Sequence, residues 1–318
     1  MNNLPQQFKA KVAEHIIINE KFRFVHLELM VPDRIEFVAG QYVSIDMGEG
    51  YRRSYSIASS PSDNHAVELC VDITPGKRGS QYFEKLKPGD EVKFMAPLGQ
   101  FVMTEEDKAR EEKLLFVATG SGITPLRSMI LDLLEDKEDK RLIRLFWGLR
   151  FVKDMFWEEE FRLKHESFPN FHYKLMLSKP PLKWPLLAGY STHEIETLEL
   201  DNTWGAYLCG NPEMITEVKE LVVKKGVPES QVHFEKFFWY HLFMAKYKVK
   251  ILRDKCIGAA SCVGIAPETF KLDDENIAIL LSEDKDTAEN ILLGAQSCPT
   301  NAIEIYDAVT NEKVWPKE

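Results

Sequence analysis

Residues 114–125 read LLFVATGSGITP, and this stretch decides how the middle of the chain folds. Its first five residues are apolar without alternation, which is typical of a strand buried on both faces of a sheet. Gly120 and Gly122 allow a tight turn, and Pro125 stands where a helix would begin, a position that proline favours. The order of strand, glycine turn and helix indicates a βα unit of a parallel sheet with a candidate phosphate-binding turn.

The residues that follow repeat this alternation. Apolar strands and helices are predicted in turn at 142–147, 154–164, 173–177, 206–209 and 212–225. Strands that alternate with helices indicate βαβ units. We therefore assign residues 109–240 to an α/β domain with a parallel sheet, and we expect 179–202 to form a loop with one short helix.

The part of the chain before this domain has a different pattern. Residues 8–103 contain short alternating segments, such as 24–29 and 67–71, that are separated by glycine, proline and aspartate turns. Many short strands at close spacing favour a small antiparallel barrel, which we assign to residues 1–108. The charged run TEEDKAREEK at 104–113 is predicted to be a solvated linker.

The last quarter of the chain forms a third predicted unit, 246–318, which begins with an alternating strand at 246–251. It contains Cys256, Cys262 and Cys298, three of the five cysteines of the chain. A zinc site built on them would need a fourth ligand, and this unit has no histidine. The clustered cysteines therefore point to another kind of metal site.

Composition narrows the classes of function. The net charge of −10 disfavours nucleic acid as a partner, because basic surface supplies that affinity. No segment approaches the roughly 20 apolar residues that span a bilayer, and the N-terminus lacks the apolar stretch of a signal peptide. An odd number of cysteines argues against a disulfide framework. We expect a cytoplasmic protein without a membrane span.

The stretch RRSYSIASSP at 52–61 carries the strongest motif of the first half. It resembles the R-x-Y-S signature of the ferredoxin–NADP reductase family, and GQY at 40–42 resembles the lead-in to that signature. The resemblance implies an FAD-binding barrel. Arg53 would pair with the flavin phosphate, Tyr55 would stack on the isoalloxazine ring, and Ser56 would hydrogen-bond the reactive flavin N5 as a catalytic residue.

A second stretch of the same region, GKRGS at 76–80, precedes a short predicted helix at 81–86. Backbone amides at a helix N-terminus bind phosphate well. In the family this place holds the FAD pyrophosphate, so Gly79 and Ser80 are predicted cofactor-binding residues. The loop also favours FAD over FMN.

The loop GSGITP at 120–125 resembles the nicotinamide-binding loop of the same family. The resemblance implies that Gly120, Gly122, Thr124 and Pro125 receive the pyrophosphate and nicotinamide side of NAD(P)H. The loop lacks the third glycine of the usual dinucleotide fold. Discrimination between NADH and NADPH rests on contacts to the ribose 2′-oxygen, for which Arg150, Ser178 and Lys179 are candidates or else plain surface residues; family resemblance slightly favours NADH.

Two more elements complete the predicted nicotinamide site. YLCGNPEM at 207–214 resembles the C-G-x-x-x-M element of the family, in which the cysteine lies beside nicotinamide and flavin; here it contributes Cys209, Gly210 and Met214. HFEKF at 233–237 contributes Glu235, predicted to assist proton or hydride handling, and Phe237, predicted to shield the flavin face. A lone Cys209 would otherwise be a small core residue.

The C-terminal unit resembles bacterial single-cluster ferredoxins. Their pattern is C-x2-C-x2-C followed by a distant C-P, and here Cys256, Cys262 and Cys298-Pro299 match it while Ala259 replaces the central cysteine. Three thiolates suit a 3Fe-4S cluster; a 4Fe-4S cluster with an exposed iron and a cluster-free fold are the alternatives. The unit is thus expected to be a small α+β ferredoxin-like domain.

The two resemblances together predict an FAD-dependent ferredoxin–NAD(P)+ oxidoreductase with a fused ferredoxin. Hydride would pass from NAD(P)H to FAD, and single electrons to the cluster and on to an external acceptor such as a haem monooxygenase, or in reverse. The alternatives are an electron-transfer subunit of a larger dehydrogenase or hydrogenase complex, and a flavin-based nitrite, quinone or oxygen reductase. The aromatic stretch 237–245 would pack between domains or dock the cluster near the flavin.

Overall fold

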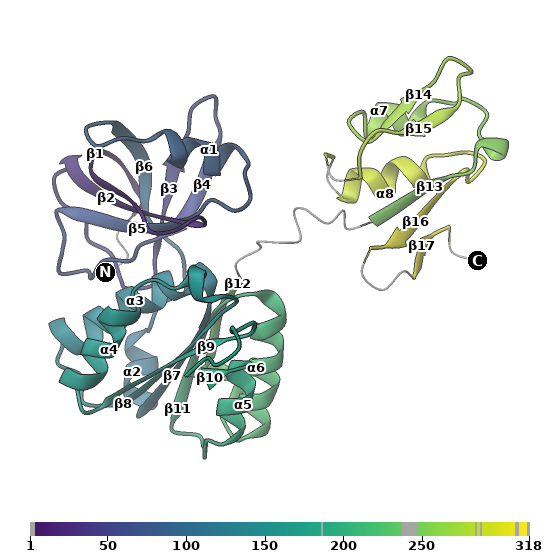
Figure 1. The fold of residues 1–318 in the computed structure, drawn as a ribbon. Helices are drawn as coiled ribbons and strands as arrows, with labels where there is room; N and C mark the ends of the chain where they lie inside the picture. The colour runs from purple at the N-terminus through teal and green to yellow at the C-terminus, as the bar shows by residue number, and fades with distance from the viewer. Residues whose placement is uncertain are drawn as a thin grey trace. The chain divides into compact units, whose positions relative to one another are not determined.

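The computed structural model of the chain describes residues 4–185, 187–236, 247–283, 285–286, 288–308 and 312–316. Its contacts divide the chain into two compact units, residues 1–237 and 238–318 (Figure 1). The predicted aromatic stretch 237–245, with Phe237, lies outside the described residues. Among the helices that are described, none has the length and apolar character needed to cross a membrane.

The first part of the reductase unit, as we name residues 1–237, is an antiparallel barrel of six strands. Their order is β4-β3-β6-β1-β2-β5, and the bridge between Ile57 and Leu69 joins the end of β4 to β5. The strands are β1 (Gln6–Ile17), β2 (Phe22–Val31), β3 (Tyr42–Asp46), β4 (Arg52–Ser56), β5 (Ala66–Asp72) and β6 (Glu91–Leu98), and helix α1 is Arg78–Lys85. Alternating burial along β1 and β2 fills the interior with apolar side chains. The predicted barrel is confirmed.

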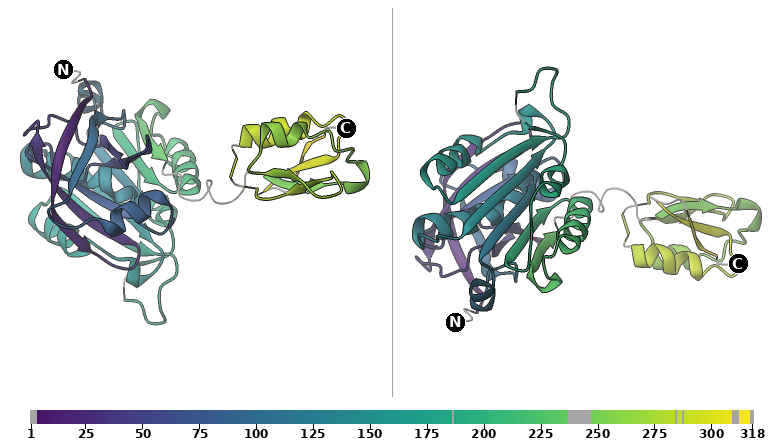
Figure 2. Two further views of the ribbon diagram at one scale, coloured as in Figure 1. Left: turned by 90° about the horizontal axis from the view of Figure 1, so that it is seen from above. Right: turned by 90° about the horizontal axis from the view of Figure 1, so that it is seen from below.

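The second part of the reductase unit is a parallel sheet, which the right-hand view of Figure 2 shows in teal to green. Its strand order is β10-β9-β8-β7-β11-β12. Its strands are β7 (Lys113–Thr119), β8 (Leu142–Leu149), β9 (Phe171–Leu177), β10 (Leu187–Ala188), β11 (Trp204–Gly210) and β12 (Val232–Lys236). The helices α3 (Ile123–Leu131) and α4 (Glu158–Ser167) cover one face, and α5 (Ser191–Glu196) and α6 (Pro212–Lys224) cover the other. The predicted α/β fold is confirmed.

The charged run 104–113 differs from its prediction as a solvated linker. It contains helix α2 (Glu105–Arg110), which begins with a capping box between Thr104 and Asp107. Asp107 is 6% exposed and Glu111 only 1%. The prediction was wrong because both carboxylates are paired. Asp107 accepts hydrogen bonds from the nearby Thr104 and Arg110, and Glu111 accepts from Tyr207 on the distant strand β11. A paired carboxylate can be buried where an unpaired one cannot.

The ferredoxin unit, residues 238–318, is a small α+β domain. An antiparallel sheet of order β13-β16-β17 is accompanied by the hairpin β14-β15. Its elements are β13 (Tyr247–Ile251), α7 (Ser261–Ile265), β14 (Phe270–Leu272), β15 (Ala278–Leu280), α8 (Ala288–Gln296), β16 (Ile303–Asp307) and β17 (Lys313–Trp315). Phe270, Ile291 and Ile305 are among its buried core residues. The predicted third fold is confirmed as well.

Candidate functional site

The glycine turn after β7 is pressed against the end of β11. A Cβ on Gly122 would lie 2.3 Å from the carbonyl oxygen of Cys209, so a residue other than glycine would force the two segments apart. Trp147 donates from Nε1 to the carbonyl of Gly120 at 3.0 Å, and the Thr124 hydroxyl donates back into the turn at 2.7 Å. The structure thus brings the predicted turn and Cys209 together at the N-terminus of α3, where backbone amides suit a phosphate group.

Cys209 and Glu235 are neighbours across the parallel pair β11 and β12. Cys209 is fully buried, and burial, together with the charge of Glu235, raises the pKa of its thiol well above the usual value. Burial also raises the pKa of Glu235 to about 7. Its Oε2 has no hydrogen-bond partner among the residues described. The pair therefore offers a neutral thiol and a carboxyl group that can hold or release a proton near neutral pH.

Two other predicted nicotinamide-site residues take part in packing. Pro125 is buried in the first turn of α3, and the Met214 side chain packs against the apolar core on the α5 and α6 side of the sheet.

The three candidate contacts to the ribose lie where β8 and β9 end. The amide of Lys179 donates to the carbonyl of Arg150 at 2.9 Å, and Ser178 follows β9 directly. The three candidate ribose contacts therefore lie together at the carboxyl edge of the sheet.

The predicted flavin residues meet where β4 faces the first turn of α1. A Cβ on Gly79 would lie 2.8 Å from the hydroxyl oxygen of Tyr55, so glycine is what allows this approach. The Tyr55 ring packs edge-on against Phe83 with centroids 4.8 Å apart. Burial raises the pKa of Tyr55, so its hydroxyl remains a hydrogen-bond donor. Arg53 shares the face of Tyr55 on β4, whereas alternation places Ser56 on the other face.

Positive charge collects at the beginning of α1. The guanidinium groups of Arg53 and Arg78 lie 5.4 Å and 5.0 Å from the centre of the Tyr51 ring. Lys77 occupies the N-cap, the first turn contains no acidic residue, and Ser80 in that turn is 5% exposed. A helix N-terminus with this charge suits an anion, and the donor set therefore fits the diphosphate of FAD.

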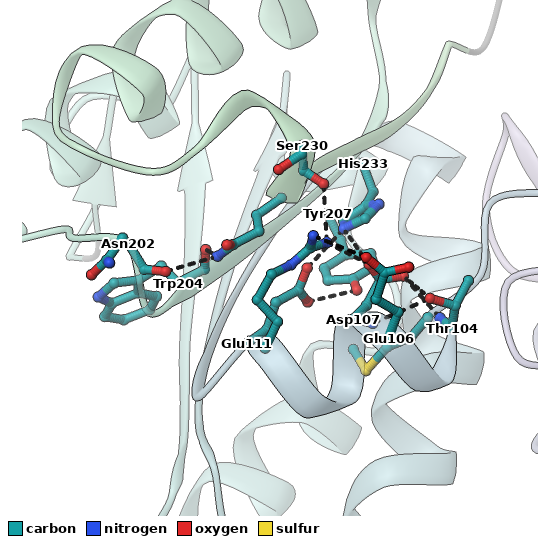
Figure 3. Close-up of polar contacts among 12 residues, drawn as sticks. Thr104, Glu106, Asp107, Glu111, Asn202, Trp204, Tyr207, Ser230 and His233 are labelled. Atoms are coloured by element: carbon teal, nitrogen blue, oxygen red, sulfur yellow. Dashed lines mark hydrogen bonds and ion pairs between the residues drawn. The ribbon is translucent and has the colours of Figure 1, made fainter.

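A buried polar network that the sequence did not reveal lies at the amino end of the parallel sheet (Figure 3). Glu111 accepts a hydrogen bond from the Tyr207 hydroxyl at 2.7 Å and lies 2.8 Å from Nε2 of His233. The rings of Tyr207 and His233 stack with centroids 4.5 Å apart. Asp107, Glu111 and His233 could together ligate a metal ion, but Arg110 already pairs with Asp107 at 2.9 Å. We therefore interpret the network as structural.

In the ferredoxin unit the three predicted cysteine ligands line one pocket together with Ala259. The backbone amide of Ala278 donates to Sγ of Cys256 at 3.4 Å. Burial raises the pKa of the Cys262 thiol, and the neighbouring Cys298 and Cys256 add to this effect. A pocket that gathers three thiols and a backbone donor fits an iron–sulfur cluster, and the methyl group of Ala259 occupies the remaining ligand position of the motif.

Cys298 is the best supported of these thiols. The backbone amide of Ala302 donates to its Sγ at 3.4 Å, and the hydroxyl of Thr300 lies 3.6 Å from the same atom. Burial raises the pKa of Cys298, but these donors and the nearby amides outweigh it and leave the pKa below the usual value. Donors aimed at sulfur stabilise the thiolate form that binds iron.

Comparison with known protein families agrees with all three domains. Residues 9–103 match the oxidoreductase FAD-binding domain, residues 116–220 match the oxidoreductase NAD-binding domain, and residues 252–305 match the 4Fe-4S single cluster domain of ferredoxin I. The matches follow one another along the chain in the order that the motifs predict.

Individual relatives extend this result. The phenol hydroxylase P5 protein of Acinetobacter pittii is 35% identical over 245 residues, which are 74% of this chain and 67% of that protein. Ferredoxin–NADP reductase B of Sorangium cellulosum is 33% identical over 212 residues, 63% of this chain and 85% of that protein. The crystal structure of the Amycolatopsis cytochrome P450 reductase GcoB has a TM-score of 0.67 at 28% identity, covering 73% of this chain and 70% of the other.

The fold, the paired phosphate and dinucleotide elements and these relatives agree with one another. The predictions of FAD, a nicotinamide dinucleotide and an iron–sulfur cluster as the redox groups are confirmed, without the cluster type. The chain belongs to the ferredoxin–NADP reductase family and is an FAD-dependent NAD(P)H oxidoreductase with a fused iron–sulfur ferredoxin domain, which passes electrons to an external acceptor.

Proposed function

We propose that this chain is the reductase of a monooxygenase system, and that its ferredoxin domain delivers the electrons of NAD(P)H to a separate oxygenase protein. The observation that carries this proposal is the three-thiol pocket on the same chain as the dinucleotide turn. The printed names of two relatives, a phenol hydroxylase protein and a cytochrome P450 reductase, support an oxygenase as the acceptor. They favour this role over a subunit of a larger dehydrogenase or hydrogenase complex.

Arg53, Tyr55, Gly79 and Ser80 would hold FAD, with Ser56 hydrogen-bonded to its reactive edge. A bound flavin supplies two-electron chemistry toward a nicotinamide and one-electron chemistry toward an iron–sulfur cluster. The guanidinium of Arg53 neutralises phosphate charge. The protonated hydroxyl of Tyr55 can donate a hydrogen bond.

The turn 120–125 would receive NAD(P)H. Gly122 lets the turn lie against β11 without a side chain between them. Cys209 adds a small neutral group there, because its thiol stays protonated, and Gly210 follows it on β11. Glu235 can take up or release a proton near neutral pH. Phe237 would cover the flavin face that the nicotinamide must reach.

We further propose that the cluster is of the 3Fe-4S type, held by Cys256, Cys262 and Cys298. The support is that Ala259 lines the same pocket and has no atom that can ligate iron. Iron and sulfide analysis of anaerobically purified protein, with EPR of the oxidised form, tests this. A paramagnetic oxidised cluster with three irons is expected, and an EPR-silent oxidised cluster with four irons would contradict it.

Anaerobic titration with NADH and with NADPH tests the function itself. We expect the flavin absorbance to bleach first. The EPR signal of the oxidised cluster should disappear next, and electrons should then reach an added oxygenase. If neither nicotinamide bleaches the flavin, the proposed function is wrong. If both centres are reduced but only a multisubunit complex from the native cell accepts electrons, the subunit alternative replaces it.

Three finer assignments complete the proposal. We propose NADH as the preferred donor, with Arg150, Ser178 and Lys179 at the ribose. We propose a cytoplasmic location, because none of the five cysteines, all of which the structure describes, forms a disulfide bond, which suits a reducing compartment. We also propose domain boundaries at 1–108, 109–240 and 246–318, and limited proteolysis with mass spectrometry tests them.

A further inference from the structure

Arg127 on α3 ties the nicotinamide domain to the barrel. Its side chain is only 12% exposed. It donates from Nε to both carboxylate oxygens of Glu160 at 2.9 Å and 3.0 Å, and from Nη1 to Glu68 at 2.7 Å. Nη1 also donates to the carbonyl oxygen of Ala58 at 2.8 Å. One guanidinium thus holds α4 of its own domain and two segments of the barrel.

The two barrel partners of Arg127 lie at the point where the barrel closes. The amide of Ala58 donates to the carbonyl of Glu68 at 2.8 Å, next to the bridge that joins β4 to β5. Ala58 is also two residues beyond Ser56, the end of the predicted flavin strand. The hydroxyl of Ser128, the next residue of α3, donates to the carbonyl of Ser59 at 2.7 Å. The helix that begins at the nicotinamide turn is therefore bonded to the backbone that continues the flavin strand.

We call the contacts of Arg127 with Glu160, Glu68 and Ala58 the clamp, and the charges in it are well matched. Burial lowers the pKa of Arg127, but the carboxylates of Glu160 and Glu68 outweigh this and raise the pKa above its usual value, so the guanidinium stays charged. It also lies 4.5 Å from the ring centre of Trp157, a favourable cation–π distance. His26 lies 3.8 Å from the second oxygen of Glu68. Every charge in the clamp therefore has a partner.

Other polar contacts also cross this seam: Lys21 pairs with Asp154, Lys153 pairs with Glu20, and Asp136 accepts from the hydroxyl groups of Ser60 and Ser62. Arg127 differs from them because it lies on the helix that begins at the nicotinamide turn, and the core of the seam is apolar. Phe22 of the barrel packs on Phe156 of the nicotinamide domain with ring centroids 4.6 Å apart, and the shared core continues along α3. Hydrophobic packing has no preferred direction, so it resists separation of the domains more than sliding. The planar fork of an arginine fixes direction as well as distance.

We propose that Arg127 is a positioning residue that sets the register between the nicotinamide turn on α3 and the flavin strand β4, and so aligns the nicotinamide for hydride transfer. This inference rests on the proposed function. Misplacement by about 1 Å far from the reacting atoms can cost on the order of 100-fold in rate. Loss of the clamp should therefore slow hydride transfer much more than it weakens nicotinamide binding.

The test compares Arg127→Met and Arg127→Lys with Arg141→Met in the full-length holoprotein. Arg141 is a matched control because it is similarly buried and pairs with Asp139 at 2.7 Å. It precedes β8 at the amino end of the parallel strands, whereas the turn follows β7 at their carboxyl end. Anaerobic stopped-flow gives the limiting rate of flavin reduction and the dissociation constant for NADH. Hydrogen exchange in the full chain without added nicotinamide reports on residues 56–62 and 120–131.

For Arg127→Met we expect a limiting rate lower by about 10- to 100-fold, a dissociation constant changed by less than about 3-fold, and faster exchange in both segments. Arg127→Lys keeps the charge but loses the fork, so it should fold and lose rate to an intermediate extent. Arg141→Met should lose stability without these changes. If Arg127→Lys and Arg127→Met keep the wild-type rate and exchange, the inference is overturned.

The proposed function can fail separately from this inference. If neither nicotinamide reduces the wild-type flavin, the proposed function is wrong. The exchange data then still decide whether Arg127 holds the two domains in register, because they need no turnover. Unchanged hydrogen exchange in the Arg127 variants would contradict the inference that Arg127 holds the two domains in register, whether or not the protein reduces its flavin.

Discussion

Cys209 in the reductase unit and Cys298 in the ferredoxin unit are the same residue type in opposite settings. Cys209 is fully buried beside Glu235, and burial with this charge raises its thiol pKa well above the usual value. Burial also acts to raise the pKa of Cys298, but the donors from Thr300 and from backbone amides reverse the shift. One sulfur is therefore kept as a thiol, and the other is prepared as a thiolate for a metal.

The difference lies in where the partners come from. The donors to Cys298 belong to residues 300–302, so a short turn creates the site. The environment of Cys209 is created by strand β12 and by the turn after β7, which are far from it in sequence. A local site should respond to changes within its own turn, whereas a site built by the sheet should respond to changes in distant contacts.

The largest expected effect comes from Cys298→Ala. Loss of one of the three thiolate ligands should abolish the cluster and with it electron delivery to a protein acceptor, because the two remaining cysteines are too few to hold an iron–sulfur cluster. Flavin reduction by NADH should continue, since the reductase unit is a separate compact unit. Iron analysis and EPR measure the cluster, reduction of a protein acceptor measures electron delivery, and a direct assay with ferricyanide measures flavin reduction.

Cys209→Ala is the matched control for that experiment. It should keep full iron content, because Cys209 lies in the other unit, and it should lower the rate of flavin reduction instead. Loss of the cluster in Cys209→Ala, or a full cluster in Cys298→Ala, would contradict the contrast between the two sulfurs.

The next effect is expected for Ala259→Cys. Ala259 lines the pocket with the three thiols, so a fourth thiolate there should convert a 3Fe-4S cluster into a 4Fe-4S cluster. The change should appear as added iron per chain and as loss of the EPR signal of the oxidised protein. Ser261→Cys in the same pocket is the control, since Ser261 does not occupy the central position of the motif. An unchanged spectrum in Ala259→Cys would mean that this position does not face the cluster.

The same contrast explains how far the sequence could predict the molecule. The turn 120–125 is a signal over a few neighbouring residues, and the folds of the barrel and of the α/β domain follow from strand and helix periodicity. The fold of the ferredoxin unit follows from its resemblance to bacterial single-cluster ferredoxins. Glu111 finds Tyr207 across 96 positions and Arg127 finds Glu68 across 59. No periodicity encodes such pairs, so the sequence predicts a solvated linker at 104–113 and gives no sign of the contacts of Arg127.

Tyr207→Phe tests a site that depends on distant partners. It removes the hydroxyl that donates to the buried carboxylate of Glu111 at 2.7 Å. We expect a loss of about 1–3 kcal/mol in the free energy of unfolding, because a buried acceptor is left with one donor fewer. Tyr173→Phe is the matched control, since the Tyr173 hydroxyl is buried without a partner among the described residues. Urea denaturation should show a lower free energy of unfolding for Tyr207→Phe alone. An equal decrease in both variants would mean that the network contributes little to stability.

The smallest expected effect is the pH dependence of Glu235, which also sharpens the account of Cys209. Burial raises the pKa of Glu235 to about 7 from 4.5. The stability that the neutral carboxyl group contributes is fully present below pH 4.5 and is lost as the pH rises through about 7, since the folded state must then charge a buried group. Glu235→Gln stays neutral, so its free energy of unfolding should rise relative to the wild type between about pH 5 and about pH 8. Histidines titrate in both proteins, so the difference between them is the measurement. A difference that stays constant with pH would show that Glu235 ionises normally and that burial alone keeps Cys209 protonated.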